Sequence, residues 1–177
     1  MNTNVTHLPL ELIRNDEART LDPHDAIAVH ELLNRLFLAE DSRDADALRQ
    51  CVTEDLSHHH SLYGFLQGRE VFVQWVLANP QLFDGLRHQA LNVVTSSEDP
   101  NTARAVSYIL VFQLYSNDEA LAVTLPRLIA HGVVRDKIAK QAGKWRIKER
   151  IYDQLSVLGS LLSDRSIRAK ASELISP

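Results

Sequence analysis

The sequence predicts an α+β fold in which three N-terminal helices pack on a strongly curved, mostly antiparallel sheet. Apolar residues recur at helical spacing up to Asn79-Pro80, and beyond Pro80 they alternate with a period of two. Helices followed by a run of strands are typical of an α+β domain with the helices gathered on one side of the sheet. A bent sheet closed by helices leaves a cavity with one open mouth, which suits a small apolar ligand.

Three helices are predicted before the change of period. The first begins at Asp22-Pro23, because aspartate is a good N-cap and proline fits the first helical position. A second, shorter helix is expected from about Ala45 to Val52, and a third from Glu70 to Leu77, which Asn79-Pro80 ends. The apolar stripe of the first helix consists of Ala26, Val29, Leu32, Leu33, Leu36 and Phe37.

Extended structure is predicted for residues 58–65, and strands follow at 87–96, 103–115, 128–140 and 145–152, with a loop at 116–127. Apolar residues occupy both faces of the strand at 103–115, which suggests that a second copy covers the outer face. We therefore expect a homodimer or a homotrimer. Arg146, Lys148 and Arg150 alternate with Trp145, Ile147, Glu149 and Ile151. We therefore expect these three basic residues on an outer or interface face of the last strand.

The length of 177 residues fits one domain, expected at 22–154 with an N-terminal extension at 1–21 and a C-terminal tail or short helix at 155–177. The net charge of −4 and the absence of a basic block argue against nucleic acid as a partner. No apolar run reaches the roughly 18 residues that a membrane helix needs, and the start of the chain does not resemble a signal peptide. Cys51 is the single cysteine, so we expect a cytoplasmic protein without an internal disulfide.

His88 is the leading candidate for chemistry, because an imidazole with a pKa near 6.5 exchanges protons close to neutral pH. A carboxylate beside it would complete an acid–base pair, and Glu40 and Asp41 both lie at the end of the first helix. On a helical wheel Glu40 falls near the centre of the apolar stripe and Asp41 near its edge. Periodicity alone therefore favours Glu40, and two carboxylates close together would raise one pKa and make Glu40 a candidate acid.

Four segments, 40–48, 87–92, 130–136 and 143–150, resemble in order and spacing the SnoaL-like branch of the nuclear-transport-factor-2-like, cystatin-like α+β cone superfamily. The resemblance covers roughly residues 24–153. Scytalone dehydratase and hexachlorocyclohexane dehydrochlorinase of this superfamily pair an aspartate after the first helix with a histidine on the first long strand. The resemblance implies that Asp41 and His88 form the same catalytic dyad, and that Asn92 matches a pocket asparagine of the dehydrochlorinase.

The resemblance also shows departures. Scytalone dehydratase has tyrosines at the positions of Glu40 and about His60, and its second pocket histidine has no match in this chain. The acid–base pair carries over, whereas the groups that orient the substrate do not. The residues expected to bind substrate are Glu40, His60, Tyr63, Phe65, Trp75, Asn92, Tyr108 and His131.

A metal site is not expected, because only His58 and His60 of the triple histidine share a strand face and no nearby Cys, Asp or Glu completes a convincing ligand set. We expect a cofactor-independent lyase, dehydratase or isomerase acting on a small apolar or cyclic molecule, with neither a nucleic acid nor a membrane as partner. Two alternatives remain open. One is a noncatalytic ligand-binding or assembly protein of the same fold. The other is a ring-hydroxylating dioxygenase small subunit, which the strand at 145–150 resembles.

Overall fold

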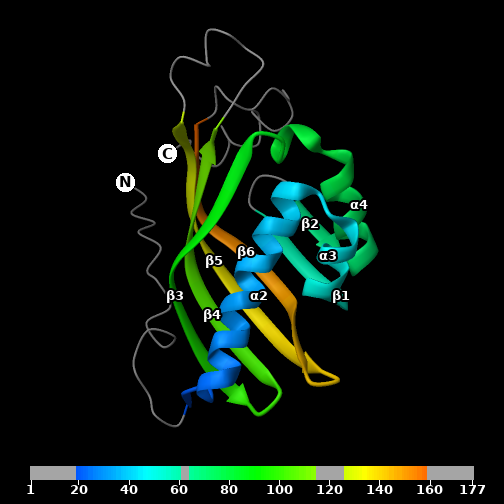
Figure 1. The fold of residues 1–177 in the computed structure, drawn as a ribbon, viewed down its shortest axis with the longest axis vertical. Coiled ribbons are helices and arrows are strands. Elements are labelled where there is room, and N and C mark those ends of the chain that lie inside the picture. Colours follow the sequence, from blue (N-terminus) through cyan, green and yellow to red (C-terminus); the bar gives the residue numbers. More distant parts are fainter. Residues whose placement is uncertain (1–18, 61–63, 115–125, 159–177) are drawn as a thin grey trace, which may run out of the picture.

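The computed structural model describes residues 19–60, 64–114 and 126–158, and it confirms the α+β class. Within these ranges three helices, α2 (Pro23–Ser42), α3 (Ala45–Cys51) and α4 (Arg69–Ala78), lie on one side of a six-stranded sheet (Figure 1). A short 3-10 helix, η2 (Pro80–Leu82), follows α4. The strands are β1 (Val52–His60), β2 (Gly64–Gln67), β3 (Leu86–Asp99), β4 (Thr102–Gln113), β5 (Arg127–Gln141) and β6 (Lys144–Val157).

The strand order is β2-β1-β6-β5-β4-β3. Only β1 and β6 pair in parallel, and the other described pairs are antiparallel, as the sequence predicts. Figure 1 shows the long strands β3 to β6 bending past α2, with α3 and α4 beside the short strands β1 and β2. The inner face of the sheet and the helices therefore enclose a common interior.

Helix α2 carries the predicted N-terminal signals, and Asp22 accepts a hydrogen bond from the backbone N–H of His24 at 2.9 Å. Its apolar stripe faces the interior, where Ala26 is half-buried and the other five residues are buried. The helix continues through Glu40 and Asp41 to Ser42. It ends at Arg43, which adopts the left-handed conformation with φ of 50°. Because the helix stays regular, its last turn directs Glu40 and Asp41 in adjacent directions toward the interior.

Several boundaries differ from the prediction. Strand β1 begins at Val52, where the second helix was expected to end, and the predicted extended segment 58–65 is divided between β1 and β2. Strand β6 runs to Val157, past the expected domain boundary at 154. The greater part of the N-terminal extension, most of the predicted loop at 116–127 and the tail beyond 158 lie outside the described residues.

The sheet contains several register shifts, and two of them change which of the residues discussed above face inward. In β3 the register shifts between Leu91 and Val94, and Asn92 there has a φ of 51°. In β6 the register shifts between Ile147 and Glu149. Each bulge adds one residue and reverses the alternation beyond it. The prediction for Arg150 was therefore wrong, because this residue points inward and is 1% exposed.

None of the helices in the described ranges is long and apolar enough to cross a membrane.

Candidate active site

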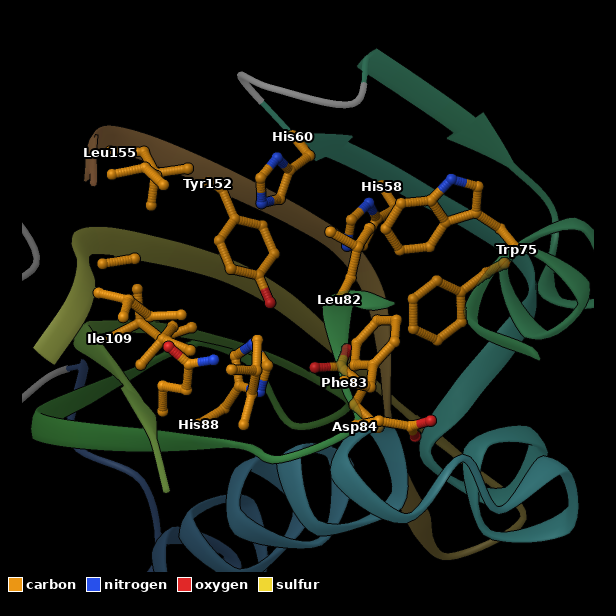
Figure 2. A pocket seen from close by; sticks show the side chains of 18 residues that line it. His58, His60, Trp75, Leu82, Phe83, Asp84, His88, Ile109, Tyr152 and Leu155 are labelled. Carbon is orange, nitrogen blue, oxygen red and sulfur yellow. The ribbon is translucent and has the colours of Figure 1, made fainter. Parts of the chain in front are cut away.

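A cavity of about 120 Å³ lies between the end of α2, helix α4, the η2 turn and the inner face of the sheet. An apolar cavity of roughly 150 Å³ is known to hold one benzene molecule, so the space suits a compound of about one ring. Its apolar wall includes Phe72, Trp75, Leu82, Phe83, Ile109 and Val111. Its polar lining includes Glu40, His58, His60, Asp84, His88, Gln113 and Tyr152, several of which are labelled in Figure 2.

Asp41 and His88 form a close pair at one side of this cavity. The Nδ1 atom of His88 lies 2.6 Å from Oδ1 of Asp41, and the backbone N–H of His88 donates to Oδ2 of the same carboxylate at 3.1 Å. A carboxylate only accepts hydrogen bonds, so we assign the proton of the neutral imidazole to Nδ1. Nε2 is then unprotonated and available as a base on a residue that lines the cavity.

The pair is shielded from bulk water. The side chains of His88 and Asp41 are 12% and 5% exposed. The rings of Phe37 and Phe83 each lie 5.9 Å from the His88 ring, and the Phe37 ring is nearly parallel to it. Two contacts to one carboxylate and two aromatic neighbours hold the imidazole in one orientation, which acid–base catalysis requires.

Glu40 lies beside this pair on the cavity wall and is 3% exposed. Burial raises the pKa of its carboxyl group from 4.5 to about 7, although the Arg150 guanidinium and His88 act in the opposite direction. Near neutral pH this carboxyl group is therefore protonated in a large fraction of molecules. A protonated carboxyl in a cavity can donate a proton to a leaving group or a hydrogen bond to a substrate.

His58, His60 and Tyr152 form another part of the wall, across the cavity from His88 (Figure 2). The Tyr152 ring lies 4.6 Å from the His60 ring and 5.4 Å from the His58 ring. Burial lowers the pKa of His58 to about 3 and that of His60 well below its usual value, so both rings are neutral near pH 7. Nδ1 of His58 is buried and has no hydrogen-bond partner among the described residues.

A buried ion pair lies behind this wall. Arg150 donates to both carboxylate oxygens of Asp136, at 2.8 and 3.0 Å, and the two side chains are 1% and 0% exposed. The guanidinium carbon also lies 4.8 Å from the centre of the Phe37 ring. The positive charge of Arg150 is thus matched by the carboxylate of Asp136.

Four predicted substrate-binding residues lie away from the cavity, and those predictions require correction. Phe65 is 51% exposed and contacts His59 on the opposite face of the sheet from His58. Tyr108 and His131 contact each other on the outer face, because Ile109 and Val111 take the inward positions of β4. Asn92 is exposed because the bulge turns it away from the face that carries His88.

Among the other predicted residues, the structure places Glu40, His60, Trp75 and His88 on the cavity wall, while Tyr63 lies outside the described residues. Tyr152 and Phe83 line the cavity, and Arg150 lies behind it, but sequence reasoning did not select any of them for the site. Counting alternate residues along the last strand placed Arg150 on the outer face. Tyr152, two positions later, shares the face of Arg150 and was therefore missed for the same reason. Gly85, two residues after Phe83, is a turn signal in the sequence, and its φ of 78° in the structure agrees with a turn there.

No cluster of three or more His, Cys, Asp or Glu side chains in the described ranges is arranged to hold a metal ion. His58 and His60 stack with their ring centres 6.3 Å apart, and both contact aromatic rings. Both histidines therefore pack among aromatic rings in the wall of the cavity.

The curved sheet, its covering helices and the enclosed cavity define the chain as a cystatin-like α+β cone protein. A model of the SnoaL-like domain matches residues 23–151, and the chain belongs to this family. No curated protein sequence matches the chain significantly.

Solved structures share the same fold. A cystatin-like protein of unknown function from Nostoc punctiforme PCC 73102 is 21% identical, with a TM-score of 0.64 over 75% of this chain and 92% of its own. A candidate scytalone dehydratase from Novosphingobium aromaticivorans DSM 12444 is 16% identical, with a TM-score of 0.62 over 76% and 88%. LinA is also 16% identical, with a TM-score of 0.62 over 76% and 90%. At these identities the likeness establishes the fold alone.

Proposed function

We propose that this chain is a cofactor-independent lyase of the dehydratase kind, or an isomerase, that acts on a small neutral ring compound. The observation that carries the proposal is the 2.6 Å contact between Asp41 and Nδ1 of His88, which leaves Nε2 free on the wall of a small, mostly apolar cavity. In this proposal His88 removes a proton from the substrate. Asp41 fixes the imidazole tautomer and stabilises the imidazolium that forms.

Glu40 supplies the second half of the chemistry. Elimination of water or a halide leaves negative charge on the departing group, and isomerisation requires return of a proton at another carbon. A buried carboxyl group with a pKa near 7 can serve either need. One protein with the same fold, the candidate scytalone dehydratase from Novosphingobium aromaticivorans, is named for an elimination of this kind, which supports the proposal.

Turnover of a compound panel tests the proposal. The panel contains neutral single-ring alcohols, halides and unsaturated ketones. Loss of water or hydrogen halide is followed by mass spectrometry, and double-bond migration by NMR. We expect His88→Ala to reduce the rate of any converted compound by about 10²–10⁴-fold, the usual contribution of a general base. His131→Ala is the matched control, because this histidine lies on the outer face of the sheet.

Equal rates for His88→Ala and the unchanged protein would refute the proposal. Compounds that bind in the cavity without conversion would favour the second candidate, a noncatalytic ligand-binding protein with the same interior.

We also propose that the chain pairs with a second copy through the outer face of β3, β4 and β5. Leu91 and Leu128 are 41% and 48% exposed there. They are register neighbours of Tyr108 and Phe112, so the four side chains form one apolar surface. Surfaces of this kind mark protein contacts.

A further inference from the structure

The hydroxyl of Tyr152 has an unusual position among the polar groups of the cavity. Its ring packs against His60 and His58, and its oxygen extends from β6 into the space on the side where His88 lies (Figure 2). The residue is 8% exposed and lines the cavity. A buried phenol normally has a hydrogen-bond partner for its proton.

The hydrogen bond that Tyr152 makes leaves this proton free. Arg150 donates from a guanidinium nitrogen to the Tyr152 oxygen at 3.4 Å, which is at the long end of hydrogen-bond distances. A guanidinium can only donate, so the phenol oxygen must be the acceptor. No side chain within the described part of the chain accepts a hydrogen bond from Tyr152. Its O–H group is therefore a buried donor without an acceptor among the described residues.

The charge balance around the hydroxyl indicates what it can bind. Arg150 is neutralised by Asp136, and burial keeps His58 and His60 uncharged. Burial also raises the pKa of the Tyr152 phenol, so it stays protonated and remains a donor. This wall offers a hydrogen bond without an unmatched positive charge. It therefore favours a neutral oxygen acceptor over a carboxylate or a phosphate.

We propose that Tyr152 binds the carbonyl oxygen of a neutral, single-ring ketone, and that the Arg150–Asp136 pair is the positioning element that directs the phenol proton into the cavity. This inference rests on the proposed function, since it places the substrate between Tyr152 and His88. When Nε2 of His88 takes a proton from the carbon next to the carbonyl, the C–H electron pair forms a C=C bond. The carbonyl π pair then moves to oxygen, where the Tyr152 hydrogen bond is strongest.

Binding of two shape-matched probes tests the inference without any turnover. Cyclohexanone carries the carbonyl oxygen, and methylenecyclohexane has a similar shape without an acceptor. In the unchanged protein we expect the carbonyl stretch of bound, isotope-labelled cyclohexanone to move to lower frequency than in an apolar solvent. We also expect cyclohexanone to bind more tightly than methylenecyclohexane, once their affinities are corrected for transfer from water to hexane.

Tyr152→Phe should abolish the frequency shift and weaken cyclohexanone binding by roughly 2- to 12-fold, the range of one hydrogen bond. Binding of methylenecyclohexane should be unchanged, which shows that the cavity is intact. Tyr108→Phe is the matched control, because this tyrosine lies on the outer face and should leave both readouts unaltered. The double variant Arg150→Met, Asp136→Leu frees the phenol to rotate. The frequency shift of the bound carbonyl should then become smaller, and its absorption band should become broader.

Three results would overturn the inference: failure of the unchanged protein to bind either probe, a frequency shift that persists in Tyr152→Phe, or no corrected preference for cyclohexanone. The shift should survive in His88→Ala. Equal turnover in His88→Ala and the unchanged protein, together with an intact frequency shift, would refute the proposed reaction while leaving the Tyr152 site in place.

Discussion

Replacing Glu40 with glutamine should remove a pH dependence of stability that burial imposes on this carboxyl group. Glu40 is 3% exposed, and its pKa is raised from 4.5 to about 7. Between these two pH values the unfolded chain has released the proton while the folded chain retains it. The folded state therefore binds more protons, and stability falls as pH rises. The stabilising contribution is complete below pH 4.5 and is lost as pH rises through about 7.

The magnitude follows from the two pKa values. At about 1.4 kcal/mol per pH unit, the interval corresponds to roughly 3 kcal/mol. Glutamine has a similar shape and does not ionise. The free energy of unfolding of Glu40→Gln minus that of the unchanged protein should thus increase by roughly 3 kcal/mol from pH 4 to pH 8. His58, whose pKa is lowered to about 3, makes stability rise with pH, but it is present in both proteins and cancels in the difference.

Urea unfolding at a series of pH values, followed by the fluorescence of Trp75 and Trp145, measures this difference. Glu31→Gln is the matched control on the same helix, because Glu31 is solvent-exposed and forms an ion pair with the exposed Arg35. Its stability difference should stay small and nearly constant with pH. A difference for Glu40→Gln that stays constant within about 0.5 kcal/mol would refute the reasoning, since it would mean that burial does not hold this carboxyl group protonated.

Three further predictions test other parts of the structure. Asp41→Asn should lower turnover of any converted compound by roughly 10²–10⁴-fold at little cost in binding, because an amide cannot stabilise the imidazolium; steady-state kinetics would show this as a fall in kcat. Asp136→Leu alone should cost about 3–5 kcal/mol in urea unfolding because it leaves Arg150 buried and unpaired, whereas Asp136→Leu with Arg150→Met should be nearly neutral. Leu128→Lys should convert a dimer or trimer to a monomer in light scattering, and a monomeric unchanged protein would contradict the proposed interface.

Local patterns were sufficient to predict most of the fold. The helical stripe on α2 and the alternation on β3 to β5 reflect burial against one neighbouring layer, and such burial repeats with the period of the element itself. The capping residues Asp22 and Pro23 mark the start of α2 for the same local reason. Strand β1 was harder to predict, because its register follows from parallel pairing with β6, which is far away in the sequence.

The site was only partly predictable, because β-bulges interrupt the alternation of inward and outward side chains on which the prediction relies. Asn92 was expected beside His88, and the bulge at Asn92 itself removes it from that face. The bulge between Ile147 and Glu149 brings Arg150 and Tyr152 inward. A bulge depends on the partner strand, so one sequence read alone does not reveal it. The helical wheel and the family resemblance pointed to different carboxylates, and the structure places Glu40 on the cavity wall and Asp41 against His88.

The energetics of the interior favour a chemical role for these groups over a structural one. A buried ion pair such as Arg150–Asp136 contributes little net stability compared with apolar residues of the same size. Glu40 and His58 reduce stability further, because burial disfavours their charged forms and Nδ1 of His58 has no partner among the described residues. A scaffold that needed only a packed core would be more stable with apolar side chains at these positions. These polar groups lower the stability of the fold, yet they gather around one small cavity that also holds an oriented imidazole. Acid–base chemistry on a neutral ligand requires such an arrangement.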